Sequence, residues 1–80
     1  MEKKLLIYTS EKCPSCKRVK AILDKQGIQY EQINMDDKEN FMKALMNQVA
    51  ATPTLQIGDK KLFARNSTTE EIMKFIKEAK

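Results

Sequence analysis

The chain is 80 residues long, 41% hydrophobic and 32% charged, which limits it to one small domain that we expect to span residues 1–80. Fifteen Lys and Arg against eleven Asp and Glu give a formal net charge of +4, a modest excess that favours acidic partners. There is no basic stripe interleaved with aromatic residues and no zinc-finger spacing, which excludes the usual modes of nucleic-acid binding.

The first expected element is a strand over residues 4–9, where a short apolar run is rich in β-forming residues. The run from Leu5 to Tyr8 is also the longest unbroken apolar stretch, and it is too short to span a membrane or to form the core of a signal peptide. Because nothing addresses the chain for export and its two cysteines can stay reduced, we expect a cytoplasmic protein without membrane partners. Nothing in the sequence demands more than a monomer.

Both cysteines of the chain follow this strand in the segment Cys13-Pro14-Ser15-Cys16, and the chain has no histidine. The apolar residues over 19–23 have helical spacing, so the pair lies where a strand passes into a helix. Pro14 lacks a backbone N–H and fits the first helical position, which makes Cys13 the expected N-cap. Two cysteines at such a junction are typical of a thioredoxin-type redox dithiol.

The two sulfurs are expected to behave differently. As the N-cap, Cys13 faces unpaired N–H groups and the helix macrodipole, which favour a thiolate, and Lys12, Lys17 and Arg18 add cations nearby. Cys16 lies on the apolar stripe of the same helix and is expected to be the more buried sulfur. We therefore expect Cys13 to attack a substrate disulfide and Cys16 to resolve the mixed disulfide that forms.

Three other interpretations of the cysteine pair are weaker. A structural disulfide across two intervening residues closes a very short loop, worth only about 2 kcal/mol. A structural zinc site needs four ligands, and two cysteines without a histidine do not supply them, so no metal is expected. An inert buried pair is disfavoured because Pro14 and the surrounding Lys and Arg side chains indicate that the first sulfur faces solvent.

The middle of the chain has a weak strand and a second helix. Gly27 is expected to cap the first helix, and residues 28–35 have a weak strand pattern, which we assign to a sheet edge. Asp36 and Glu39 then have capping-box spacing, with Asp36 as the N-cap. The apolar residues that follow have helical spacing and are expected to face the core, where methionine fills irregular gaps: Met42, Leu45, Met46 and Val49.

The last part of the chain predicts a hairpin and a helix. Residues 52–57 form an expected strand that begins at a proline, and a Gly-Asp turn signal predicts that residues 60–63 return as an antiparallel strand. A last helix opens with capping-box spacing at Thr68. The order β-α-β-α-β-β-α predicts an α/β protein with a four-stranded mixed sheet and helices on both faces.

This order, with Cys-Pro-Ser-Cys opening the first helix and Thr52-Pro53 opening the third strand, resembles the glutaredoxins and the small glutaredoxin-like redoxins over nearly the whole chain. The resemblance implies the minimal thioredoxin fold and a thiol–disulfide oxidoreductase that reduces protein or glutathione mixed disulfides. It also implies that Pro53 is cis and faces the dithiol, while the main chain of Thr52 pairs with an extended substrate peptide or with glutathione.

Glutathione is the co-substrate that the resemblance implies. Candidate groups for its carboxylates are Lys12, Gln48 and the amides that open the last helix near Thr68, since a helix N-terminus is an anion site. Ser15, between the cysteines, completes the expected substrate-binding set.

Three positions depart from the glutathione-using members, which commonly have a tyrosine between the cysteines, a lysine three residues before the first, and a Gly-Gly pair before the last helix. Here those positions hold Ser15, Ser10 and, approximately, Phe63-Ala64. The departures leave open a redoxin that is reduced by thioredoxin reductase and that donates electrons to ribonucleotide reductase.

A function of another class also stays open. In some glutaredoxins the first thiolates of two protomers hold an iron–sulfur cluster with two outside thiols. Pro14 at the helix start and the resolving Cys16 favour the redox function over this one.

Overall fold

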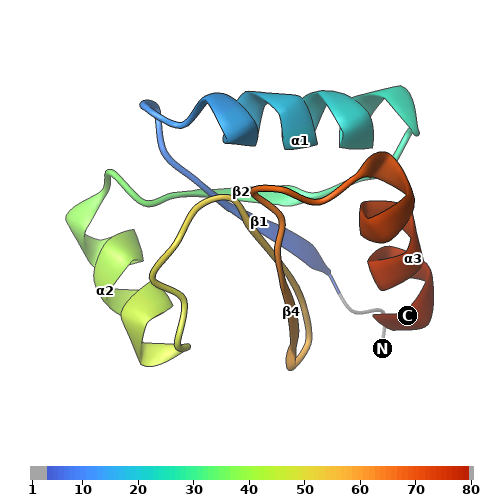
Figure 1. Cartoon of the computed structure of the whole chain (residues 1–80). Helices are drawn as coiled ribbons and strands as arrows, with labels where there is room; N and C mark the ends of the chain where they lie inside the picture. The colour runs from blue at the N-terminus through green and yellow to red at the C-terminus, as the bar shows by residue number, and fades with distance from the viewer. Residues whose placement is uncertain (1–3, 80) are drawn as a thin grey trace.

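The computed structural model describes residues 4–79, which fold into one sheet flanked by helices (Figure 1). The elements in chain order are β1 (Leu5–Thr9), α1 (Pro14–Lys25), β2 (Glu31–Asn34), α2 (Lys38–Met46), β3 (Thr54–Ile57), β4 (Lys60–Phe63) and α3 (Thr69–Ala79). The expected order is confirmed, although β2 and β3 are shorter than the segments 28–35 and 52–57. Among the described residues, no helix is both long and apolar enough to cross a bilayer.

The strands form a mixed sheet in the order β2-β1-β3-β4. β1 and β2 are parallel, with Thr9 opposite Asn34, because α1 carries the chain back across one face before β2 begins. β3 is antiparallel to both β1 and β4, and Gly58 (φ 60°) lies in the turn of the β3–β4 hairpin. β2 is therefore an edge strand, as expected, and the carboxyl ends of β1 and β2 lie side by side.

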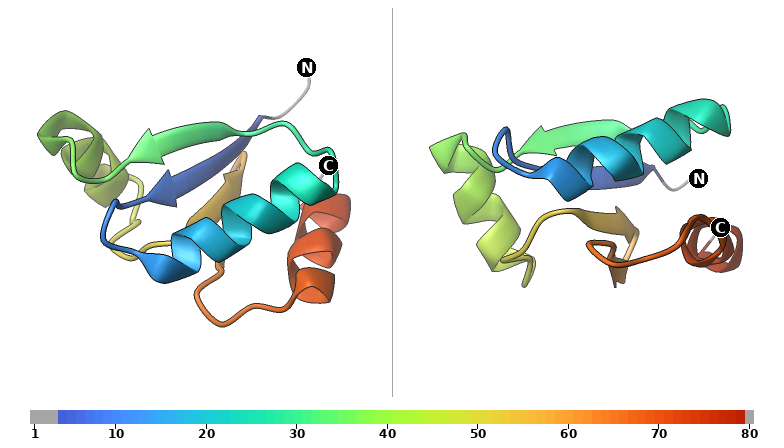
Figure 2. Two further views of the ribbon diagram at one scale, coloured as in Figure 1. Left: turned by 90° about the horizontal axis from the view of Figure 1, so that it is seen from above. Right: turned by 45° about the horizontal axis from the view of Figure 1, so that its top comes forward.

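The larger core lies between the sheet and the helices α1 and α3, which cover the same face (Figure 2). Alternate residues of β1 and β3 point to this face, and the apolar stripes of the two helices pack onto them. The buried residues of this layer are Leu5, Ile7, Val19, Leu23, Leu55, Ile57, Ala64, Ile72, Ile76 and Ala79. Because burying a large aliphatic side chain contributes about 1.5–3 kcal/mol, this layer fixes α1, and with it the dithiol, on the sheet.

A smaller core lies on the opposite face, beside α2, and its buried residues are Tyr8, Met35, Ala44 and Val49. The expectation that the apolar stripe of α2 is buried is wrong for Met42, Leu45 and Met46, which are 57%, 46% and 84% exposed. The reason is geometric. Helix α2 has nine residues and buries only Ala44, so it approaches the sheet through one small side chain. Within residues 4–79, no other helix or strand covers its exposed apolar residues.

The helix starts follow the capping rules, with one correction. At α3, Thr68 and Glu71 form the expected capping box, since each accepts a hydrogen bond from the backbone N–H of the other at 3.2 Å. At α2 the N-cap is Asp37 and not Asp36, and Asp37 accepts from the N–H of Glu39 at 2.9 Å. The capping-box spacing to Glu39 favoured Asp36, but the carboxylate of Asp36 instead bonds Ser10 and Glu11.

The helix ends use the left-handed backbone conformation. Gly27 follows α1 with φ 69°, and Gln48 follows α2 with φ 64°. After α2, the N–H of Val49 bonds the carbonyl of Ala44 at 2.8 Å, which closes the last turn. Glycine adopts this conformation at no steric cost, whereas glutamine does so at a cost of about 1–2 kcal/mol.

Candidate active site

Both cysteines lie at the junction between β1 and α1. Cys13 is the N-cap of α1, with an extended backbone, and Pro14 begins the helix. The N–H of Cys16 points back at Cys13 and lies 3.3 Å from its Sγ and 3.2 Å from its carbonyl oxygen. Both residues are free thiols, of which Cys13 is half-buried and Cys16 is buried.

Hydrogen bonds favour the ionised form of Cys13 over that of Cys16. Partial burial raises the pKa of Cys13, but donors around the sulfur outweigh this effect and lower the pKa below its usual value. The donors are the Cys16 thiol, the Thr52 hydroxyl and the backbone N–H groups of Cys16 and Ser15. The lowered pKa favours the thiolate, which is the form that attacks disulfides.

The sulfur of Cys16 has the opposite tendency. Burial raises its pKa, and so does the hydrogen bond that its thiol donates to Cys13, while the backbone N–H of Ser10 and the Thr52 hydroxyl act weakly in the other direction. Cys16 therefore remains a thiol under conditions in which Cys13 is ionised. The arrangement supplies one ready nucleophile and one protonated partner next to it.

The sulfur of Cys13 opens onto a pocket of about 190 Å³. The lining residues come from three parts of the chain: Ser10, Lys12, Cys13, Pro14 and Ser15 at the β1–α1 junction, Thr52 before β3, and Arg65 between β4 and α3. The lining includes two cations and no carboxylate. Such a pocket favours a ligand that carries negative charge next to its disulfide.

The structure brings together part of the expected substrate site. Lys12, Ser15 and Thr52 line the pocket. Pro53 is fully buried next to Thr52 in the chain, and the peptide bond between them is cis, as the family resemblance implies. Two expected residues lie elsewhere. Gln48 is an exposed residue at the end of α2, and Thr68 caps α3.

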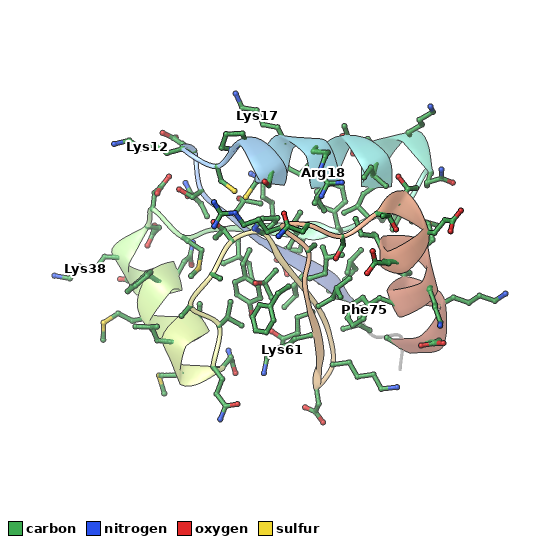
Figure 3. The ribbon with its side chains drawn as sticks, viewed as in Figure 1. Lys12, Lys17, Arg18, Lys38, Lys61 and Phe75 are labelled. Carbon is green, nitrogen blue, oxygen red and sulfur yellow. The ribbon has the colours of Figure 1, made fainter. Side chains whose placement is uncertain are left out.

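Arg65 was not expected from the sequence, and a hydrogen-bonded loop holds it at the pocket. A guanidinium nitrogen of Arg18 donates to the carbonyl oxygens of Ala64 and Arg65, at 3.2 Å each. Figure 3 shows Arg18 on the sheet side of α1 and Lys17 on the opposite side. The expectation that these two cations lie beside the first sulfur is corrected, since Arg18 binds the loop and Lys17 points away.

Asp36 is the other residue whose place the sequence did not reveal. Its carboxylate accepts hydrogen bonds from the Ser10 hydroxyl at 2.9 Å and from the Glu11 N–H at 2.8 Å. These bonds, with the nearby charge of Lys12, hold the pKa of Asp36 below its usual value. No spacing in the sequence links Asp36 to the dithiol, because their proximity comes from the parallel pairing of β1 and β2.

Metal binding has no candidate group in the part of the chain that the structure describes, since residues 4–79 contain no cluster of three or more His, Cys, Asp or Glu side chains that could hold a metal ion.

Known proteins have sequences related to this chain. A family model described as glutaredoxin matches residues 5–62, a range that includes both cysteines and the cis proline. The chain belongs to the glutaredoxin family. Glutaredoxin 1 of Rickettsia prowazekii is 41% identical over 44 residues, which cover 49% of this chain and 46% of that protein. A glutaredoxin of Pseudomonas aeruginosa is 32% identical over 57 residues, covering 69% of this chain and 68% of the relative.

The matched segment spans about half the length of the Rickettsia relative. Solved structures agree with the fold. A mutant thioredoxin-like protein superposes with a TM-score of 0.77 at 23% identity, over 91% of this chain and 99% of that one. The holo form of glutaredoxin C1 from Populus tremula x tremuloides gives 0.70 at 20% identity, over 95% and 85%. The predicted thioredoxin fold is thereby confirmed.

Proposed function

We propose that this chain is a dithiol thiol–disulfide oxidoreductase that reduces protein disulfides or glutathione mixed disulfides through Cys13 and Cys16. The observation that carries the proposal is the unequal environment of two neighbouring sulfurs: the pKa of half-buried Cys13 is lowered and the pKa of buried Cys16 is raised. Membership of the glutaredoxin family supports the same activity.

The reaction proceeds in two exchanges. The Cys13 thiolate attacks one sulfur of the substrate disulfide, forms a mixed disulfide with it, and releases the other sulfur as a thiolate. Cys16 then loses its proton to water or to the departing thiolate and attacks the Cys13 sulfur. The second substrate sulfur leaves, and the protein retains a Cys13–Cys16 disulfide. Two electrons pass from the protein to the substrate.

The pocket lining supports a substrate that binds beside Cys13 as an extended segment. In this proposal Thr52 presents its main chain to the substrate and Pro53 shapes the wall of the site, while Lys12 and Ser15 contact the groups next to the reacting disulfide. Gln48 and Thr68 would contact only the parts of a ligand that extend beyond the pocket. Glutathione, whose carboxylates suit the two cations of the lining, is the proposed co-substrate.

Two cysteine variants test the proposed roles. Cys13→Ser is expected to abolish disulfide reduction, because in the proposed reaction no other residue makes the first attack on the substrate disulfide. Cys16→Ser is expected to accumulate mixed disulfides with the substrate, which mass spectrometry detects as a mass increase that dithiothreitol removes. Full activity of the Cys13→Ser protein would show that the roles are misassigned.

The electron donor is tested separately, because Ser10, Ser15 and, approximately, Phe63-Ala64 stand where glutathione-using members commonly have other residues. The oxidised protein is mixed either with glutathione or with NADPH and thioredoxin reductase, and the release of its thiols is followed. We expect reduction by glutathione. Rapid turnover with the reductase and none with glutathione would instead assign a redoxin that depends on the reductase.

In the proposed reaction the Cys13–Cys16 dithiol begins each cycle in its reduced form, which suits a compartment that keeps thiols reduced. We therefore propose the cytoplasm as the location of the protein.

A further inference from the structure

In the turn between β1 and α1, a single residue, Ser10, interacts with both cysteines. The carbonyl of Ser10 accepts from the N–H of Cys13 at 3.2 Å, which sets the entry of the chain into α1. A backbone hydrogen bond from Ser10 lowers the pKa of the Cys16 thiol. A movement of Ser10 therefore displaces the surroundings of both Cys13 and Cys16.

Asp36 holds this turn from the turn that follows β2. One carboxylate oxygen accepts from the Ser10 hydroxyl at 2.9 Å, and the other accepts from the Glu11 N–H at 2.8 Å. The two bonds fix consecutive residues of the turn, and they join positions that lie 26 and 25 residues apart in the chain. Hydrogen bonds to a charged acceptor are stronger than neutral ones.

Asp36 is itself held in place. Its backbone N–H donates to the Asn34 side-chain oxygen at 2.9 Å, and Thr9 is paired in register with Asn34 at the ends of β1 and β2. The turn after β1 and the turn after β2 are thus tied together where the sheet ends. Asp36 is free for this contact because Asp37 caps α2.

We propose that Asp36 is a positioning residue for the dithiol: through the Ser10 hydroxyl and the Glu11 amide it holds the β1–α1 turn in the conformation that keeps Cys13 at the start of α1. This inference rests on the proposed roles of the two cysteines, but its test follows thiol ionisation and needs no substrate.

The sign of the effect separates positioning from simple electrostatics. Removing a carboxylate near Cys13 relieves repulsion of the thiolate, and it also frees the nearby Lys12; both changes of charge lower the pKa of Cys13. Loss of the turn geometry withdraws N–H groups from the sulfur and raises that pKa. If the pKa of Cys13 rises when Asp36 is removed, the loss of positioning explains the rise and the change of charge does not.

The experiment measures the rate of iodoacetamide alkylation against pH in a Cys16→Ser background, where Cys13 is the only cysteine left to react. Asp36→Ala is expected to move the midpoint upward by about half a unit, which slows alkylation at a pH below the midpoint about threefold. Asp36→Asn is expected to restore the original midpoint or to lie slightly below it, because an amide can accept from the Glu11 N–H and donate to the Ser10 hydroxyl.

Asp37→Ala is the matched control. It removes the neighbouring aspartate and the cap of α2, so it is expected to lower the melting temperature without moving the alkylation midpoint. Ser10→Ala breaks one of the two bonds to Asp36 and is expected to give a smaller upward shift, which keeps the test available if Asp36→Ala folds poorly. An unchanged or lowered midpoint in both Asp36→Ala and Ser10→Ala would overturn the proposal.

Discussion

At the scale of single residues, the sulfurs of Cys13 and Cys16 differ because the first caps a helix and the second packs beneath it. Cys13 receives hydrogen bonds from backbone N–H groups and from Thr52, whereas Cys16 is 1% exposed. The difference is electrostatic in origin, and it combines groups at the start of α1 with the Thr52 hydroxyl, which is distant in sequence.

Arg65 is expected to select substrates that carry carboxylates. Arg65→Gln removes one of the two cations at the pocket and is expected to raise the KM for glutathione mixed disulfides about two- to fivefold, as for the loss of an exposed charge pair worth about 0.5–1 kcal/mol. The effect should shrink in high salt. Steady-state kinetics on glutathionylated and on uncharged mixed disulfides measure the difference.

Lys61→Gln removes the same charge from β4, where Figure 3 shows Lys61 far from Lys12, and serves as the control. An equal rise in KM for both variants, or for the uncharged substrate, would contradict a specific role for Arg65.

The sequence predicted those site residues whose role is local. Pro14 after Cys13 signals a helix start, and helical spacing places Cys16 on the apolar stripe. The sequence therefore indicated correctly that Cys16 is the more buried of the two cysteines. Arg65 and Asp36 were missed because tertiary pairing brings them to the site, and no local pattern records that pairing.

At the scale of helices and strands, the ends of α1 and α2 have the same backbone conformation but different residues. Gln48→Gly is expected to raise the free energy of unfolding by about 0.5–1 kcal/mol. Glycine removes the strain of the left-handed conformation, and this gain exceeds the cost of the greater entropy of glycine in the unfolded chain.

Gly27→Ala is expected to lower the free energy of unfolding by about 1 kcal/mol. Apart from Gly27 and its two chain neighbours, no heavy atom of the described residues lies within 4 Å of the position that a Cβ would take, so that cost is conformational alone. Urea denaturation measures both, and a destabilised Gln48→Gly protein would contradict the assignment.

The existence of each element was predictable from periodicity and turn residues, but some of their boundaries and burial were not. Asp36 and Asp37 are equally good N-caps, and only the contact of Asp36 with the β1–α1 turn decides between them. The apolar residues of α2 have the spacing of a buried stripe, yet burial depends on whether a neighbouring element covers them.

At the scale of the whole molecule, the two faces of the sheet contribute unequally to stability. Ile72→Ala, in the layer between α3 and the sheet, is expected to lower the free energy of unfolding by about 2–5 kcal/mol. Met46→Ala, on exposed α2, is expected to change it by less than about 0.5 kcal/mol. Chemical denaturation of the two variants provides the comparison, and a large loss for Met46→Ala would show that α2 is covered in solution.

The overall topology followed from the sequence because alternating strand and helix patterns of this length restrict the chain to few arrangements. The cis proline was implied by family resemblance and not by the local sequence, since most X-Pro bonds are trans. Which helices share a face, and how the loops before β3 and α3 close around Cys13, required the structure.

The Cys16 thiol, the Thr52 hydroxyl and backbone N–H groups favour the thiolate of Cys13, while Cys16 stays protonated. The most direct test is the pH profile of iodoacetamide alkylation of the reduced protein, with the modified sulfur located by mass spectrometry. We expect Cys13 to react with a midpoint well below the value of about 8.5 for a free thiol, and Cys16 to remain unmodified. Alkylation of Cys13 with the midpoint of a free thiol, or preferential alkylation of Cys16, would contradict the account.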